Sequence, residues 1–163
     1  QKAGRDESYD FKILDSVIEV NEKQKTILFP KIQNFFNGDL SNKKLAVWGL
    51  AFKPETDDVR EAPAIYLIEK LLNKGASLSV YDPEAMPNIK KQFGETLNYC
   101  NSMYEALENA DALIICTEWS IFRTPDFNKV KQLLKQSIIF DGRNLYDVEE
   151  IKKEGFIYSS IGR

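Results

Sequence analysis

Cationic side chains that could bind an anion occur in two segments of this sequence. Lys53 and Arg60 lie in the segment from Gly49 to Arg60, and Arg143 follows an Asp-Gly pair. A lysine ammonium is a compact positive charge, and an arginine guanidinium can bind two phosphate oxygens side by side. These residue types therefore indicate a phosphate site that relies on side-chain charge.

The two cations of the first segment also have an alternative role on a solvated surface. Lys53 and Arg60 stand close in sequence to Asp57 and Asp58, with which they could form exposed ion pairs. Such pairs are common and contribute little to stability. The sequence leaves both roles open for Lys53 and Arg60.

Two further polar positions follow apolar runs that we interpret as strands. Arg143 could clamp a phosphate, or it could pair with Asp141 or Asp147. Asp82 follows an expected strand at a position where an acidic residue often binds a ribose hydroxyl. The Asp-Pro dipeptide that begins at Asp82 is also typical of a turn, and we favour the turn.

Nucleophilic and metal-binding chemistry has little support in the sequence. There is no histidine, and Cys100 and Cys116 do not form a Cys-x-x-Cys motif. We therefore expect no metal site, and any chemistry done by this chain alone would have to come from carboxylates, lysines, tyrosines or a thiol. Cys116 ends an apolar run and has no histidine to activate it, so we interpret it as a core residue. Trp119 and Phe122 could stack on a ligand ring, but core packing is the favoured role.

The elements that must position these residues alternate along the chain from residue 43 onward. Apolar strands alternating with helices predict a parallel sheet covered on both faces, an α/β Rossmann-like doubly wound fold. In such a sheet the loops after the strands share one edge, so the candidate residues should gather there. The expected strands are 45–48, 78–81, 97–99, 112–116, 138–141 and 156–159, and the expected helices are 63–75, 88–93, 102–109, 126–136 and 147–155.

A long N-terminal arm helix is expected to precede the sheet. Apolar residues recur at helical spacing over residues 11–36, and Pro30 should kink or divide the helix. We therefore divide the chain into an arm at 1–38 and a Rossmann-like domain at 43–163. The apolar stripe could cover a sheet, a second domain or a second subunit.

The overall composition excludes several classes of function. Among 163 residues, 22 are Lys or Arg and 25 are Asp or Glu, which gives a net charge of −3. We expect no nucleic-acid binding, because that affinity needs excess cations. The longest apolar runs are far shorter than a bilayer span, so we expect no membrane segment. The unpaired cysteines are typical of a reducing, cytoplasmic location.

Four strings of residues, in this order and spacing, give the chain a strong family resemblance. It resembles the C-terminal domain of UDP-glucose 6-dehydrogenases, in the UDP-glucose/GDP-mannose dehydrogenase family. The arm, residues 17–25, resembles the central helix through which these enzymes form homodimers. The strings are Gly-Leu-Ala-Phe-Lys-Pro-Glu-Thr-Asp-Asp-Val-Arg-Glu (49–61), Tyr-Asp-Pro (81–83), Ile-Cys-Thr-Glu-Trp (115–119) and Phe-Asp-Gly-Arg (140–143).

The resemblance implies an activity and a set of site residues. The family oxidises UDP-glucose to UDP-glucuronate with two NAD, which an N-terminal domain mainly binds. By resemblance, Phe52, Lys53 and Arg143 contact the UDP-sugar substrate, and Arg60 reaches across the cleft to NAD.

The chain departs from the whole family pattern in two respects. It contains neither a Gly-x-Gly-x-x-Gly fingerprint nor the Gly-Gly-Ser-Cys-type segment that carries the family nucleophile. We therefore expect a piece of a longer enzyme that is inactive alone. The alternatives are a related dehydrogenase for GDP-mannose or a UDP-N-acetyl amino sugar, a stand-alone non-catalytic nucleotide-binding module, and a purely structural partner domain.

Overall fold

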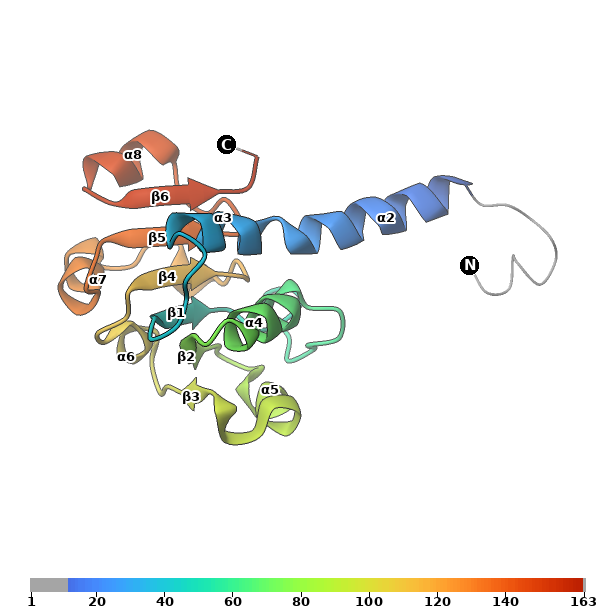
Figure 1. The fold of residues 1–163 in the computed structure, drawn as a ribbon, viewed down its shortest axis with the longest axis horizontal. Helices are drawn as coiled ribbons and strands as arrows, with labels where there is room; N and C mark the ends of the chain where they lie inside the picture. The colour runs from blue at the N-terminus through green and yellow to red at the C-terminus, as the bar shows by residue number, and fades with distance from the viewer. Residues whose placement is uncertain (1–11, 163) are drawn as a thin grey trace.

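Parallel strands form a single sheet in the computed structural model, which describes residues 12–162 (Figure 1). Every neighbouring pair is parallel, and the strand order is β3-β2-β1-β4-β5-β6. This is the doubly wound Rossmann order, so the expected fold class is confirmed. The strands are β1 (Lys44–Trp48), β2 (Ser77–Tyr81), β3 (Asn98–Tyr99), β4 (Ala112–Ile115), β5 (Ile138–Asp141) and β6 (Ile157–Ser160).

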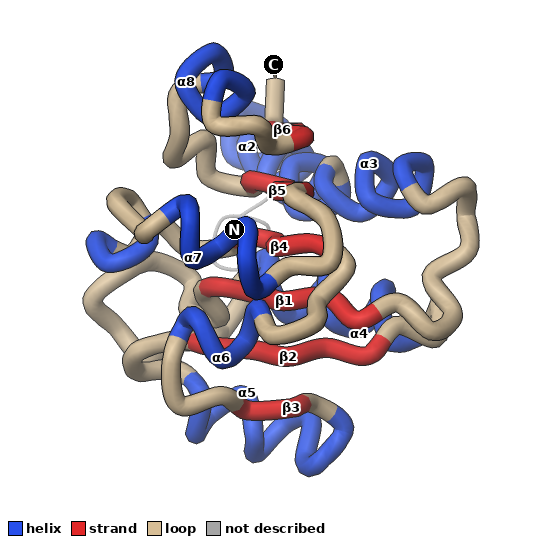
Figure 2. The backbone as a smooth tube through the Cα atoms, turned by 90° about the vertical axis from the view of Figure 1, so that its left-hand side faces the viewer, coloured by secondary structure: helices blue, strands red, loops and turns tan. Residues whose placement is uncertain are grey.

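Helices cover both faces of this sheet, as Figure 2 shows from a second direction. The first face carries α3 (Leu28–Phe35), α4 (Pro63–Asn73) and α5 (Met86–Phe93). The second face carries α6 (Met103–Leu107), α7 (Phe127–Leu133) and α8 (Val148–Lys153). Two short 3₁₀ turns, η1 (Gly94–Thr96) and η2 (Ser120–Phe122), lie in the connections.

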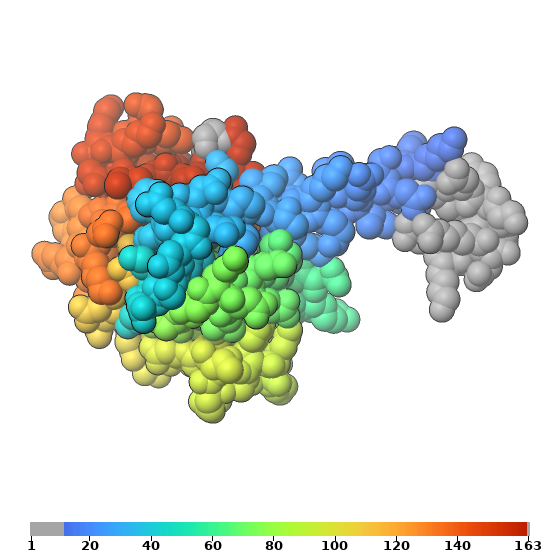
Figure 3. All heavy atoms as spheres, in the orientation of Figure 1, coloured from blue at the N-terminus to red at the C-terminus, as the bar shows by residue number. Residues whose placement is uncertain are grey.

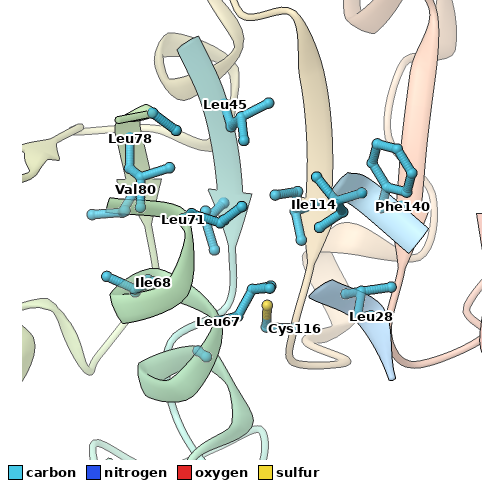
Figure 4. Close-up of a cluster of buried hydrophobic side chains, with 14 of the residues drawn as sticks. Leu28, Leu45, Leu67, Ile68, Leu71, Leu78, Val80, Ile114, Cys116 and Phe140 are labelled. Atoms are coloured by element: carbon cyan, nitrogen blue, oxygen red, sulfur yellow. The ribbon is translucent and has the colours of Figure 1, made fainter. Parts of the chain in front are cut away.

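Strand β1 shows why the sheet needs cover on both sides. Leu45 and Val47 belong to the core cluster of the first face, which Figure 4 shows in part, whereas Ala46 and Trp48 belong to that of the second. All four side chains are fully buried. Burial of apolar surface stabilises the fold by roughly 25 cal/mol per Å². The Trp48 indole Nε1 donates to the carbonyl of Met103 at 2.8 Å, so its polar atom is also satisfied.

Local sequence signals position several of these helices. Pro63 occupies the first turn of α4, as expected. Ser102 begins α6 and its hydroxyl accepts from the Glu105 amide at 3.1 Å, while the Glu105 carboxylate accepts from the Asn101 amide at 2.7 Å. The Ser102 half of the expected capping box is thereby confirmed, whereas the Glu105 carboxylate bonds the amide of Asn101 in place of that of Ser102.

The arm is divided, as Pro30 predicted. Helix α2 (Lys12–Thr26) ends one residue before Ile27, and α3 begins directly after it. A proline removes one hydrogen bond to the carbonyl four residues earlier, and its ring crowds that carbonyl. For Pro30 that carbonyl belongs to Thr26, where α2 ends. The part of the expected arm before Lys12 lies outside the described residues.

The two halves of the arm have different surroundings. In α3, Leu28, Phe29 and Ile32 are buried in the core against the sheet. In α2 no residue is buried, and the helix projects beyond the sheet on the side toward which the strands point (Figures 1 and 3). Its large apolar side chains are exposed, at Ile13, Leu14, Val17, Ile18 and Val20.

Candidate functional site

A hollow of about 890 Å³ lies where α2 meets the carboxyl edge of the sheet. Its walls include Lys25 of α2, Phe52 after β1, Cys116 and Glu118 after β4, and Arg143 after β5. Ligands of open parallel sheets bind at this edge, because the loops that follow the strands converge there. The volume is within the range of about 300–1,000 Å³ found for small-molecule sites.

The sequence-predicted residues divide into two groups around this hollow. Phe52 and Arg143 line it, and Phe52 is 45% exposed. Lys53 and Arg60 are exposed and are not among the lining residues. Lys53 follows Phe52 directly and, within residues 12–162, takes part in no ion pair shorter than 4.0 Å. The ion pair with Asp57 or Asp58, one of the two roles left open for Lys53, is therefore not formed.

Arg143 is held by Glu118, a partner that the sequence did not suggest. The guanidinium Nη2 donates to Glu118 Oε1 at 2.7 Å, and Nε donates to Oε2 of the same carboxylate. These hydrogen bonds hold the pKa of Glu118 below its usual value and raise the pKa of Arg143. A guanidinium has five N–H donors, so two of them serve Glu118 and three stay available to a ligand.

The turn that carries Arg143 is fixed by Asp141, the last residue of β5. The buried Asp141 carboxylate accepts from the backbone amides of Arg143 and Leu145, both at 2.7 Å. It also accepts from the Tyr158 hydroxyl at 2.8 Å. Burial, followed by the charge of Asp141, raises the pKa of Tyr158, which keeps that hydroxyl a donor. Asp141 thus accepts from the backbone amide of Arg143, whereas the guanidinium of Arg143 donates to Glu118.

Arg60 makes the exposed ion pair that was one of its two expected roles. Its Nη2 donates to Asp58 Oδ2 at 2.7 Å, and its Nε donates to both carboxylate oxygens. Hydrogen bonds from Arg60 lower the pKa of Asp58 to about 2. The Asp58 carbonyl also accepts from the Phe52 amide at 2.8 Å, which closes the loop that begins at Gly49.

Asp82 is buried and turned toward the backbone of its neighbours. Its Oδ1 accepts from the amides of Glu84 and Ala85, which confirms the expected turn. Its Oδ2 accepts from the amides of Leu50 and Ala51, in the loop after β1. A ribose hydroxyl cannot reach this carboxylate, which is only 1% exposed.

The remaining candidates belong to the core. Cys116 is buried between Leu28 and Leu67 where it borders the hollow (Figure 4), and burial raises the pKa of its thiol to about 12. Phe122 is buried and stacks on Trp48, with 5.0 Å between ring centroids. Within residues 12–162, no group of three or more acidic, cysteine or histidine side chains could hold a metal ion. No helix in the same range is both long and apolar enough to span a bilayer.

Comparison with known proteins gives one family. Residues 46–148 match a family model described as the UDP-glucose/GDP-mannose dehydrogenase family, UDP binding domain. UDP-glucose 6-dehydrogenase TuaD of Bacillus subtilis is 44% identical over 155 residues, which are 95% of this chain and 33% of that protein. UDP-glucose 6-dehydrogenase of Pseudomonas aeruginosa is 40% identical and covers 99% of this chain and 37% of its own length.

Solved structures show the same likeness. A UDP-glucose dehydrogenase from Pyrobaculum islandicum aligns over 91% of this chain and 33% of its own, with a TM-score of 0.77 and 28% identity. A UDP-D-ManNAc dehydrogenase from Pyrococcus horikoshii aligns over 85% of this chain and 30% of its own, with a TM-score of 0.64 and 28% identity. The chain thus spans about a third of the length of the relatives that it matches.

Proposed function

The chain belongs to the UDP-glucose/GDP-mannose dehydrogenase family, and we propose that it binds the UDP part of UDP-glucose within a UDP-glucose 6-dehydrogenase. The observation that carries this proposal is the joint placement of Phe52 and Arg143 around the hollow at the carboxyl edge of the sheet. An aromatic ring and a guanidinium suit a ligand that combines a base with a diphosphate.

Arg143 supplies the charge complementary to the diphosphate in this proposal. Glu118 occupies one edge of the guanidinium and leaves its other donors for the phosphate oxygens. Lys53 adds a second cation beside Phe52, where its ammonium can turn toward a bound anion. Binding therefore depends on side-chain charge, because the loop after β1 has a single glycine, Gly49, in place of the glycine-rich fingerprint.

The proposed activity of the whole protein is NAD-dependent oxidation of UDP-glucose to UDP-glucuronate. The residues present do not fit NAD in the loop after β1, because the amides of Leu50 and Ala51 are already bonded to Asp82. We therefore propose that an N-terminal domain of the same protein binds NAD and provides the nucleophile. Arg60 then contacts NAD from this side of the cleft, and the 163-residue chain alone does not turn over UDP-glucose.

The arm is the proposed dimerisation element. Five large apolar side chains of α2 are exposed, and a contiguous apolar stripe of this kind seeks a partner surface. A second copy of the chain can cover the stripe with its own arm. We propose a homodimer of a cytoplasmic enzyme, formed through α2.

Calorimetric titration of the chain with UDP, UDP-glucose, GDP-mannose and UDP-N-acetylglucosamine tests the proposed specificity. We expect UDP and UDP-glucose to bind more tightly than the GDP-sugar. Preferential binding of GDP-mannose or of UDP-N-acetylglucosamine would instead assign the chain to another branch of the family. Equal, weak heats from all four ligands would contradict nucleotide recognition by this hollow.

A further inference from the structure

The loop after β1 is hydrogen-bonded to an anionic side chain of the protein itself, that of Asp82 after β2. In dinucleotide-binding sheets, amides of this loop bind a pyrophosphate, and an acidic residue after the second strand binds a ribose. Both features are present in this chain, but they are bonded to each other. The amides of Leu50 and Ala51 donate to Oδ2 of Asp82 at 2.6 and 3.1 Å.

The environment of Asp82 is that of a fully bound anion. Its Oδ2 also accepts from the Trp119 indole Nε1 at 3.1 Å. Its Oδ1 accepts from the amides of Glu84 at 2.9 Å and Ala85 at 2.8 Å. Five N–H donors therefore surround a carboxylate that is 1% exposed and, within residues 12–162, forms no ion pair. Buried charge of this kind is tolerated only when hydrogen bonds replace its hydration.

The segment after β4 packs closely against the loop after β1. Gly49 has a φ of +86°, and a Cβ at this position would lie 2.6 Å from the Thr117 backbone nitrogen. The Thr117 hydroxyl donates to the Ala51 carbonyl at 2.6 Å, so both backbone groups of Ala51 are used. The loop after β1 is thus held by β2 through Asp82 and by the segment after β4 through Thr117.

We propose that the Asp82 carboxylate is a built-in substitute for a phosphate and a specificity-determining residue of this domain. It accepts hydrogen bonds from the amides that would otherwise donate to a dinucleotide phosphate. It also fixes the backbone directly before Phe52 and Lys53, and this positioning role rests on the function proposed above. The exclusion of a second anion does not depend on UDP binding.

Chemical rescue tests the built-in anion without any nucleotide. Asp82→Gly removes the CH₂–COO⁻ group, which acetate can replace, and Asp82→Ala leaves a space that formate can fill. We expect each variant to lose roughly 10 °C in Tm. Acetate or formate should recover most of that loss, whereas sodium chloride at equal ionic strength should not. Glu84→Ala, which removes an exposed neighbouring carboxylate, should show neither the loss nor the rescue.

A second experiment distinguishes anion binding at the loop after β1, once Asp82 is removed, from anion binding in the hollow that Arg143 lines. Pyrophosphate should raise the Tm of the double variant Arg143→Ala/Asp82→Gly. It should leave the Tm of the single variant Arg143→Ala unchanged. Equal effects of acetate and chloride on both Asp82 variants would overturn the proposal. If these variants do not fold even in acetate, the Tm of Asp82→Asn provides the test. This substitution removes the charge and turns an amide NH₂ toward N–H donors that now bond the carboxylate. A Tm equal to that of the unsubstituted chain would then refute the role of the charge.

A positioning role has its own readout in UDP titrations of Asp82→Gly. With acetate present, the affinity for UDP should return toward that of the unsubstituted chain. Recovery of Tm without recovery of affinity would refute the positioning role and leave the built-in anion standing. If the unsubstituted chain itself does not bind UDP, that result would instead contradict the proposed function.

Discussion

The guanidinium of Arg143 donates to both carboxylate oxygens of Glu118, and the two residues line the same hollow from the loops after β5 and β4. The pair joins two neighbouring loops and restricts the guanidinium to one orientation. An arginine restrained in this way loses less conformational freedom when a phosphate binds. In the proposed site, Arg143 is therefore already oriented before UDP arrives.

The ion pair predicts a pH dependence of stability. Arg143 lowers the pKa of Glu118, so the contribution of the pair is present above about pH 4.5, the ordinary range of Glu. It is lost as the pH falls through the lower pKa of the folded state. Because both side chains are partly exposed, the contribution is on the order of 1 kcal/mol. Urea unfolding of the unsubstituted chain and of Arg143→Ala should differ by this amount at pH 7 and converge as the pH falls below the lowered pKa of Glu118.

Direct titration of the Glu118 carboxyl by NMR provides a sharper form of this test. In Arg143→Ala the pKa of Glu118 should rise, because its two strongest hydrogen bonds are gone. Arg60→Ala serves as the control, since Arg60 pairs with Asp58 instead. An unchanged Glu118 titration in Arg143→Ala would mean that the pair does not persist in solution.

Gly49 should tolerate no side chain. Its positive φ disfavours other residues by about 1–2 kcal/mol, and overpacking against Thr117 adds about 1–3 kcal/mol. Gly49→Ala should therefore lower the free energy of unfolding by about 2–5 kcal/mol. Gly38 has a similar φ of +82° but open space around it, so Gly38→Ala isolates the backbone cost. Equal losses in the two variants, measured by urea unfolding, would argue against the close approach to Thr117.

Lys53 should contribute to UDP binding although its side chain lies outside the lining of the hollow. Lys53→Ala should weaken UDP binding by on the order of 1.5 kcal/mol, the lower range for a charge-assisted contact. The measurement is calorimetric titration at two salt concentrations, and the difference between variant and parent should shrink at high salt. An affinity that is indifferent to this substitution would remove Lys53 from the site.

The apolar stripe of α2 should determine the oligomeric state. Replacing Val17 and Val20 by glutamate places two charges on the exposed apolar face and should convert a dimer into a monomer. Lys23→Glu is the control, because Lys23 is a charged, exposed residue on the same helix. Light scattering gives the mass directly. A mass that stays dimeric in the double variant would place the dimer interface elsewhere.

The fold was predictable because its signals are local. The apolar runs at Leu45–Trp48 and Ala112–Ile115 and the break near Pro30 follow from neighbouring residues alone. Helix ends were less predictable: α7 ends at Leu133 rather than near residue 136. There the Leu133 carbonyl accepts from the amide of Asn109, at the end of the α6 segment, and no local pattern encodes that contact.

The site was predictable in its location but not in its partners. Four loop segments were expected at one edge, and residues from three of them line the hollow. The partner of Arg143 lies 25 residues away, at Glu118, and the amides bound by Asp82 lie 31 and 32 residues away. Such pairs arise from strand order, which brings distant loops together. Residue type therefore indicated an anion site, whereas the internal ion pair required the tertiary structure.

Calorimetric titration of UDP into the unsubstituted chain, Arg143→Ala and Arg60→Ala tests the central claim most directly. Both variants lose one arginine; Arg143 lines the hollow together with Arg123, whereas Arg60 is not among its lining residues. We expect Arg143→Ala to weaken UDP binding by about 1.5–3 kcal/mol, or roughly 10- to 150-fold. Arg60→Ala should leave the affinity nearly unchanged. UDP binding that is insensitive to Arg143, or equally sensitive to both arginines, would contradict the account.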